Sequence, residues 1–196
     1  MKKSTLWIII VVAIIVVAGL WVKGAYNRMI TQEEAVSTAW SQVENAYQRR
    51  ADLIPNLVST VKGYAAHESQ TLEDVINARS RAIRTVIDPS ELDAEELAKY
   101  QSAQGELSSA LGRLLMISEN YPDLKANQNF LQLQAQLEGT ENRISVERKK
   151  FNEASKAYNT TIRKFPTNII AGMFDFEKTA YFKAEEGSER APEVNF

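Results

Sequence analysis

The chain has 196 residues, of which 44% are hydrophobic and 24% are charged, and its formal net charge is −2. It contains no cysteine and a single histidine, so disulfides, thiolate metal sites, cysteine nucleophiles and sites built from several histidines are excluded. The length predicts one domain of ordinary size together with an anchor, while the lack of cysteine leaves the redox compartment undetermined.

Residues 1–23 have the pattern of a membrane anchor. The uncharged run 5–22 contains twelve leucine, isoleucine or valine residues, which together favour insertion by about 4–7 kcal/mol. As a helix this run would span roughly 27 Å, close to the hydrocarbon thickness of a bilayer. Trp7 and Trp21 stand at its two edges, where indole rings prefer the membrane interface. We therefore predict a single-pass transmembrane helix.

A cleaved signal peptide is the alternative interpretation, because Lys2 and Lys3 resemble a basic n-region. The apolar run is longer than a usual h-region, and residues 18–21 offer no small-x-small cleavage site, so the uncleaved anchor is favoured. Orientation is undecided. Lys2 and Lys3 on one side are balanced by Lys23 and Arg28 on the other.

The remaining sequence argues against nucleic-acid binding and against catalysis. Residues 24–196 carry 20 basic and 25 acidic side chains, a net charge of −5, so nucleic acid is not an expected partner. A di-metal bundle site would need two Glu-x-x-His motifs, and His67 is the only histidine. There is no Gly-x-Ser-x-Gly elbow and no glycine-rich phosphate loop. No catalytic residue, metal ligand or cofactor is therefore predicted, and His67 is interpreted as a helix residue near the surface.

Residues 24–171 predict an all-α, long-helix antiparallel (up-and-down) bundle. Helical patterns cover 24–87, 91–120 and 124–163, and proline-containing turns separate them. A weak capping box, Ser90 with Asp93, precedes the second pattern. The last helix has the clearest signal, an apolar residue at every seventh position: Phe130, Leu137, Ile144, Phe151, Tyr158 and Phe165.

The segment 49–58 interrupts the first helical pattern, because a proline inside a helix costs about 3 kcal/mol. We expect Pro55 to kink or break the helix. The apolar seam before it keeps its phase beyond it, which favours a kink, and then the seam would lack a partner in its own chain. It would have to meet the tail or another subunit, whereas a sharp turn at Pro55 would close a four-helix bundle. The predicted self-association seam consists of Val36, Trp40, Val43 and Tyr47.

Charged residues occupy seam positions in both long patterns, namely Arg50, Glu68, Glu141 and Arg148. Our hypothesis is an internal network of these side chains, next to the Pro55 joint, that fixes helix register, because an unpaired buried charge is costly. The alternative is that they extend to solvent from a narrow bundle edge.

Residues 172–196 predict an extended tail that docks through apolar side chains. Six acidic and three basic residues accompany these side chains, which are Phe174, Phe176, Tyr181, Phe182, Val194 and Phe196.

The chain resembles the LemA family of bacterial membrane proteins over essentially its full length. The matching blocks are YN at 26–27, RRADLIPNLV at 49–58, YAAHE at 64–68, AR at 78–79, ENYPDLK at 119–125, EGTENRI at 138–144, YN at 158–159 and FP at 165–166. Phe151 stands where tyrosine is expected before Asn152, and Asp175 stands where glycine often follows Phe174.

The resemblance implies an N-terminal anchor in the bacterial cytoplasmic (inner) membrane and a helical bundle without an established catalytic activity. It also implies a link to membrane or envelope maintenance, and some members of the family are encoded beside membrane metalloproteases. The first functional hypothesis is therefore a non-enzymatic, membrane-anchored scaffold that forms homo-oligomers and supports the envelope. The alternative is an adaptor or regulator of a membrane protease or another envelope complex. The side of the membrane that carries the bundle stays undetermined.

Overall fold

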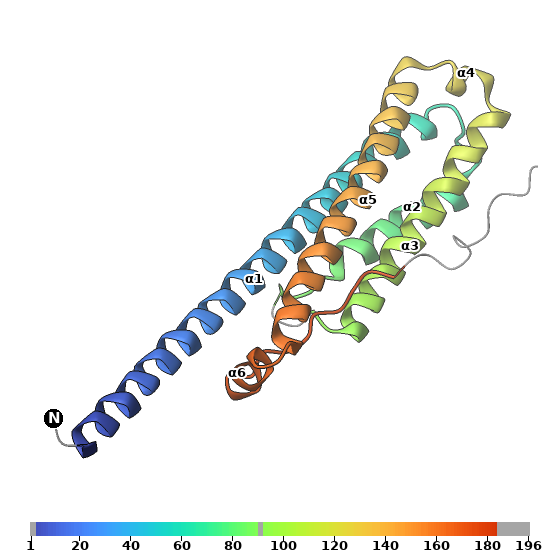
Figure 1. The fold of residues 1–196 in the computed structure, drawn as a ribbon. Coiled ribbons are helices and arrows are strands. Elements are labelled where there is room, and N and C mark those ends of the chain that lie inside the picture. The colour runs from blue at the N-terminus through green and yellow to red at the C-terminus, as the bar shows by residue number, and fades with distance from the viewer. Residues whose placement is uncertain (1–2, 90–91, 184–196) are drawn as a thin grey trace, which may run out of the picture.

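The computed structural model describes residues 3–89 and 92–183, and every regular element in these two ranges is a helix. The helices are α1 (Lys3–Lys62), α2 (Ser69–Arg84), α3 (Ala94–Ile117), the 3₁₀ helix η2 (Ser118–Asn120), α4 (Pro122–Lys125), α5 (Gln128–Arg163) and α6 (Thr167–Met173). Figure 1 shows α1, α2, α3 and α5 packed side by side with alternating direction, while the N-terminal part of α1 extends away from the bundle. The predicted all-α, up-and-down fold with an N-terminal apolar helix is confirmed.

The chain reverses direction after α1, not at Pro55. Helix α1 continues through Pro55 to Lys62, and the reversal comes at residues 63–68. There the amide of Ala65 donates to the carbonyl of Val61 at 2.8 Å. The sharp turn considered at Pro55 was therefore wrong, while the favoured kink within a continuous helix stays a prediction. The helical pattern 24–87 divides eight residues later, and α2 begins after that break.

At the turn after α2, Asp93 caps α3 by accepting hydrogen bonds from the amides of Glu95 and Glu96, both at 2.8 Å, whereas Ser90 lies outside the described residues.

The turn at residues 118–127 lies beside the first reversal. The hydroxyl of Tyr121 donates to Glu68 at 3.1 Å. This turn was expected near Pro55; it lies near Glu68 because the first reversal is farther along α1. Leu124, expected to start the last helix, belongs to the separate helix α4.

The lower half of the core, which is the half nearest the projecting N-terminal part of α1, is aromatic and is built mostly from α1 and α5. Every residue of the predicted self-association seam is buried there by the chain itself: Val36 3%, Trp40 0%, Val43 0% and Tyr47 5% exposed. The Trp40 ring packs edge-on against Tyr100 and Phe151, with centroid distances of 5.1 and 5.6 Å. The seam thus has partners in its own chain and does not need another subunit to cover it.

The tail completes this lower half. Helix α2 has 16 residues and α5 has 36, so α2 covers only the upper part of the bundle, and the C-terminal segment runs back along the lower part (Figure 1). Asp175 starts this return with φ = 55°, the left-handed region in which glycine is the least strained residue. The tail prediction is confirmed as far as residue 183, while Val194 and Phe196 lie outside the described residues.

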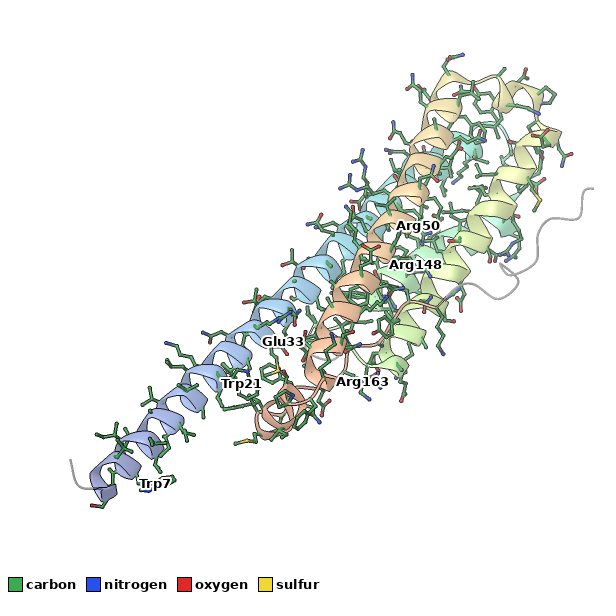
Figure 2. All side chains as sticks on the ribbon, viewed as in Figure 1. Trp7, Trp21, Glu33, Arg50, Arg148 and Arg163 are labelled. Atoms are coloured by element: carbon green, nitrogen blue, oxygen red, sulfur yellow. The ribbon has the colours of Figure 1, made fainter. Side chains whose placement is uncertain are left out.

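The N-terminal part of α1 is apolar and uncovered. From Leu6 to Leu20 its side chains are exposed, and Trp7 and Trp21 are 67% and 45% exposed. Both tryptophans lie on the helix that projects from the bundle in Figure 2. Packing against the bundle begins at Val22. By length and composition this part of α1 is suited to cross a membrane, and none of its most apolar window is buried.

Candidate functional site

A groove on the bundle surface holds the extended segment 176–183 by its main chain. Asn159 on α5 accepts a hydrogen bond from the amide of Thr179 at 3.0 Å and donates to the carbonyl of Thr179 at 2.8 Å. Asn152, seven residues earlier on the same helix, accepts from the amide of Phe182 at 2.9 Å and donates to its carbonyl at 3.0 Å. We call these two amide side chains the asparagine clamp. Because these four bonds go to main chain, they fix the register of the segment without selecting its side chains.

A pocket next to the clamp receives the side chain of Phe182. Phe182, 6% exposed, stacks on Trp40 with a centroid distance of 5.9 Å and an interplanar angle of 18°. Phe151 packs edge-on against the Phe182 ring with a centroid distance of 5.4 Å, and the guanidinium of Arg148 lies 4.9 Å from the centroid of the Phe182 ring. The pocket therefore favours an aromatic side chain, held by stacking and by a cation–π contact.

Two further polar side chains hold the last described residue of the segment. Arg148 donates to the carbonyl of Lys183 at 2.9 Å, and Gln101 on α3 donates to the same oxygen at 3.2 Å. The amide of Ala180 donates to the carbonyl of Leu92 at 3.0 Å. The segment thus bridges α3 and α5 along the part of the bundle that α2 leaves open.

The asparagine clamp was missed in the sequence. The YN pair at 158–159 was noted and assigned no chemistry. The signal was the repeat of aromatic followed by asparagine, Phe151-Asn152 and Tyr158-Asn159, one heptad apart. In each pair the aromatic residue is buried in the core, so the asparagine stands next to it at the groove edge.

A second polar site lies between α1, α3 and α5 and is centred on Arg50, which is 2% exposed. Its Nη1 donates to Glu141 at 2.9 Å and to Ser108 at 2.7 Å, and its Nη2 donates to the side-chain oxygen of Gln104 at 2.8 Å. The guanidinium also lies 5.1 Å from the centroid of the Tyr47 ring. Arg50 thus links three helices from one buried position.

Of the four residues in the proposed internal charge network, the structure brings only Arg50 and Glu141 together. Arg148 contacts the tail, and Glu68 accepts from Tyr121 at the top turn. Glu141 itself is 56% exposed, so Arg50 relies on neutral acceptors as much as on the carboxylate. The idea that the Arg50 contacts fix helix register stays a prediction.

Pro55 explains the role of Arg79. A residue at position 55 with an amide hydrogen would donate to the carbonyl of Ala51, four residues back, but proline has no such hydrogen. Arg79 on α2 supplies the missing donor, its Nε lying 2.8 Å from that carbonyl. A contact between two helices therefore replaces the lost bond within α1, which is one reason why the helix continues.

Arg79→Met should lower the free energy of unfolding by about 1.5–3 kcal/mol, because it removes a charged donor from a main-chain acceptor. In a Pro55→Ala background the new amide serves Ala51, and the loss should shrink by about 1 kcal/mol or more. Urea denaturation followed by circular dichroism in detergent measures this cycle. The exposed Arg84→Met on the same helix is the matched control, and an equal loss in both backgrounds would contradict the assignment.

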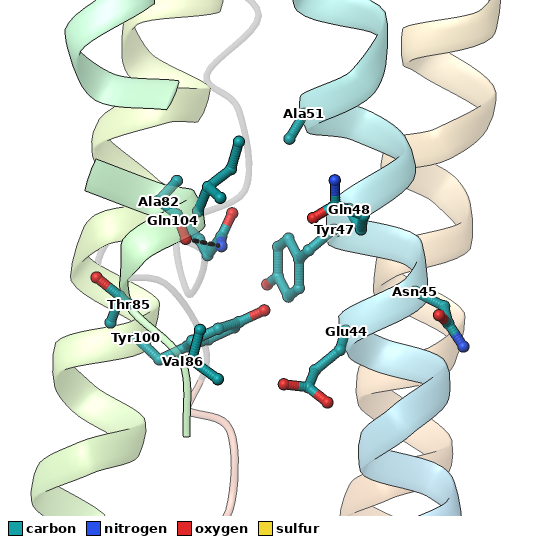
Figure 3. Close-up of a pocket in the computed structure, with 11 residues that line it drawn as sticks. Glu44, Asn45, Tyr47, Gln48, Ala51, Ala82, Thr85, Val86, Tyr100 and Gln104 are labelled. Atoms are coloured by element: carbon teal, nitrogen blue, oxygen red, sulfur yellow. Dashed lines mark hydrogen bonds between the residues drawn. The ribbon is translucent and has the colours of Figure 1, made fainter. Parts of the chain in front are cut away.

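A small pocket of about 140 Å³ opens between α1 and the loop after α2 (Figure 3). Burial raises the pKa of Glu44, which lines it, above its ordinary value of 4.5. The indole N–H of Trp40 lowers the pKa of Glu44 and so opposes this shift in part, although within the described chain it forms no hydrogen bond of regular geometry. Burial likewise raises the pKa of the Tyr100 hydroxyl far above its ordinary value. This pocket disfavours charge, and it does not gather a nucleophile with a base.

Glu44→Gln should stabilise the protein at neutral pH relative to acid pH. Because the pKa of Glu44 is raised in the folded state, its carboxyl contributes fully to the free energy of unfolding below its ordinary pKa of 4.5. The native chain loses this contribution as pH rises through the folded-state pKa. The amide variant lacks this loss, so its melting temperature should exceed that of the native chain more at pH 7 than at pH 4. Exposed Glu153→Gln is the control. The same difference at both pH values would refute the prediction.

Within the described residues no group of three or more acidic or histidine side chains is arranged to hold a metal ion.

A family model with the description LemA family matches residues 39–196. The chain belongs to the LemA family. It is 26% identical over 181 residues to magnetosome protein MamQ 2 of Paramagnetospirillum magneticum, covering 84% of this chain and 66% of that protein, just under two thirds.

Other relatives agree with this membership. Protein LemA of Metamycoplasma hominis is 26% identical over 163 residues, covering 83% of this chain and 71% of that protein. MamQ of Magnetospirillum gryphiswaldense is 28% identical over 174 residues, covering 80% and 64%. None of these names is that of an enzyme. Together with the uncovered apolar helix, they indicate that this LemA-family chain is a membrane-associated protein.

Proposed function

We propose that this LemA-family protein is a non-enzymatic scaffold, anchored by one helix in the bacterial cytoplasmic membrane, that self-assembles and supports membrane or envelope organisation. The observation that carries the proposal is the asparagine clamp and its aromatic pocket, a site suited to hold an extended peptide segment. The segment it fits is the one that every copy of the chain carries, residues 176–183.

Self-assembly would occur by exchange of this segment between neighbouring copies. A copy whose own segment leaves the groove uncovers Trp40 and Phe151, both otherwise fully buried. Burying an aromatic side chain such as Phe182 contributes about 1.5–3 kcal/mol, so an empty groove is costly and a neighbour's segment would fill it. In dilute solution the tethered segment competes at millimolar effective concentration. Anchoring many copies in one membrane raises their local concentration and makes exchange competitive.

The same clamp favours one alternative, an adaptor that holds a segment of a membrane protease or another envelope protein. Because Asn152 and Asn159 hold the segment mainly through its main chain, an unrelated extended segment with one aromatic residue would satisfy them. In that case the chain's own tail would act as the displaceable occupant.

Cross-linking between copies distinguishes the two functions. The chain has no cysteine, so Gln101→Cys in one tagged population and Lys183→Cys in another place single thiols at positions in contact across the groove. After both are reconstituted in one membrane, a short bismaleimide should join the two tags if segments exchange. A double-cysteine chain that cross-links within itself is the positive control, and Asn129→Cys, an exposed position near the start of α5, in place of Gln101→Cys is the negative control.

Exclusive cross-linking within single chains would refute the scaffold and leave the adaptor. Light scattering of protein that is fixed with glutaraldehyde in the membrane and then extracted gives an independent test, since finding only monomers after fixation contradicts self-assembly at membrane density. The orientation of the bundle is measurable by the same thiol chemistry: Lys183→Cys in intact cells reacts with an impermeant reagent only if the bundle faces outward.

A further inference from the structure

The end of the bundle nearest the N-terminal helix carries exposed apolar side chains. Phe165, Ile169 and Met173 are 81%, 56% and 72% exposed, and Phe174 is 49% exposed. They come from α6 and its two flanks, a segment without a charged residue between Lys164 and Asp175. Exposing four large apolar side chains together is unfavourable in water, which indicates that another phase or molecule covers them.

The packing of the other face of α6 against α1 determines how far these exposed side chains lie from the membrane span. Ile170 and Ala171 on that face are buried in the core cluster, and Val22 and Ala25 of α1, both partly buried, pack against this cluster. Tyr26 packs edge-on against Phe174 with a centroid distance of 4.9 Å. In Figure 2 Trp21, the edge of the apolar run, lies next to α6. At about 1.5 Å per residue, these contacts lie within roughly 10 Å of that edge, the depth of the headgroup layer.

The charged residues of the protein change from basic to acidic at the same level along α1. No acidic residue precedes Glu33 in the chain, and none lies between positions 163 and 174. The exposed basic residues near α6 are Arg163 and Lys164, with Lys23 and Arg28 on α1. Farther along α1, a hollow of about 880 Å³ is lined by seven acidic residues against one basic residue, Lys178; the acidic residues are Glu33, Glu34, Asp88, Asp93, Glu96, Asp175 and Glu177. The basic and apolar level thus ends where the acidic level begins.

We propose that Phe165, α6 and Phe174 form a membrane-surface foot that inserts into the headgroup layer of a bilayer containing anionic lipids. Apolar side chains bordered by lysine and arginine are the composition of segments that lie in this layer. A seven-residue helix would not bind a membrane by itself, but α1 already holds it at the surface, so a small gain is sufficient.

The foot has a consequence for the orientation of the bundle. A single transmembrane helix leaves the bundle free to rotate about the helix axis and to tilt. A second contact beside the first fixes which face of the bundle is turned to the membrane. The groove that holds residues 176–183 then points in a defined direction along the membrane plane, which is the geometry that exchange between neighbouring copies requires. This inference rests on the proposed membrane anchoring.

The test uses the full-length chain, which has no cysteine. Single variants Ile169→Cys and Met173→Cys carry the environment-sensitive dye NBD in vesicles of phosphatidylcholine and phosphatidylglycerol. Some of the lipids carry a nitroxide quencher near the headgroup. Ile10→Cys within the span is the positive control, and exposed Lys149→Cys, farther up α5, is the negative control. Circular dichroism checks that each labelled variant retains its helix content.

We expect blue-shifted emission and strong loss of fluorescence to nitroxide lipid at both α6 positions, and neither at Lys149. Water-like emission that aqueous iodide quenches would overturn the foot, and so would a blue shift without lipid quenching, which would mean that protein covers the face. Quenching at Ile10 but not at Ile169 refutes the foot alone, whereas quenching at neither refutes the anchoring. Arg163→Glu with Lys164→Glu should reduce the lipid quenching at Ile169, and Lys149→Glu with Lys156→Glu should leave it unchanged.

Discussion

Arg50→Met is expected to lower the free energy of unfolding by about 2–4 kcal/mol. Methionine preserves much of the apolar stem of Arg50 but removes every donor. The side-chain oxygen of Gln104, a residue only 6% exposed, then loses its 2.8 Å partner. Chemical denaturation in detergent, followed by circular dichroism, measures the loss.

Two companion variants separate the contributions of the partners of Arg50. Glu141→Gln should cost only about 0–1 kcal/mol, because Glu141 is 56% exposed and water solvates it in place of Arg50. Gln104→Leu combined with Arg50→Met should recover part of the stability, since replacing both buried partners with apolar groups removes the unsatisfied acceptor. If Arg50→Met left melting and oligomeric state unchanged, the idea that Arg50 organises the three helices would be wrong.

The sequence predicted the apolar contacts of α5 well because they depend on a local repeat. Five members of the heptad stripe, from Phe130 to Tyr158, are buried. The sixth, Phe165, is 81% exposed because α5 ends at Arg163 and the repeat runs past the helix. The repeat reports which side of a helix is apolar, but the end of the helix depends on capping and on the conformation of the residues beyond it.

The first reversal was misplaced for a different reason. Pro55 carries a local penalty that is visible in the sequence, whereas its compensation by Arg79 is a contact between residues of two helices that lie 28 positions apart along the chain. The real turn contains only Gly63 as a local signal, and the apolar phase continues across it. The hydrogen bond from Arg79 to the Ala51 carbonyl thus helps α1 to pass Pro55 and end near Gly63 instead. A contact between two helices of this kind is not visible in the pattern of a single sequence.

The seam was expected to meet either the tail or another subunit, and the structure shows Trp40 in contact with the tail and with Tyr100 and Phe151 of two helices. Its partners include Phe182, which belongs to an extended segment with no periodicity. The polar side chains that alternate with the apolar heptad positions of α5 have separate uses: Asn127 caps the helix, Glu141 binds Arg50 and Arg148 holds the tail. The last two uses depend on a group from a distant part of the chain.

Asn159→Ala is expected to release the segment around Thr179 while the bundle stays folded. The substitution removes two main-chain hydrogen bonds, together worth about 1–3 kcal/mol, in addition to the 3.0 Å bond from Asn159 to the Tyr181 hydroxyl. If the segment opens locally, the loss corresponds to roughly 5–150-fold faster hydrogen exchange of the Thr179 amide. Asn152→Ala should act in the same way on the Phe182 amide.

The two variants also test whether the clamp acts as one unit. The pocket around Phe182 lies beside Asn152, so Asn159→Ala should accelerate exchange at Thr179 more than at Phe182, and Asn152→Ala should do the reverse. The double variant should accelerate both amides beyond either single variant, because each remaining asparagine otherwise keeps the segment close to the groove. Exposed Asn129→Ala, near the start of the same helix, is the matched control and should leave both amides protected. If Asn159→Ala left the exchange rate of the Thr179 amide unchanged, the main-chain clamp would contribute nothing, and the aromatic pocket alone would hold the tail.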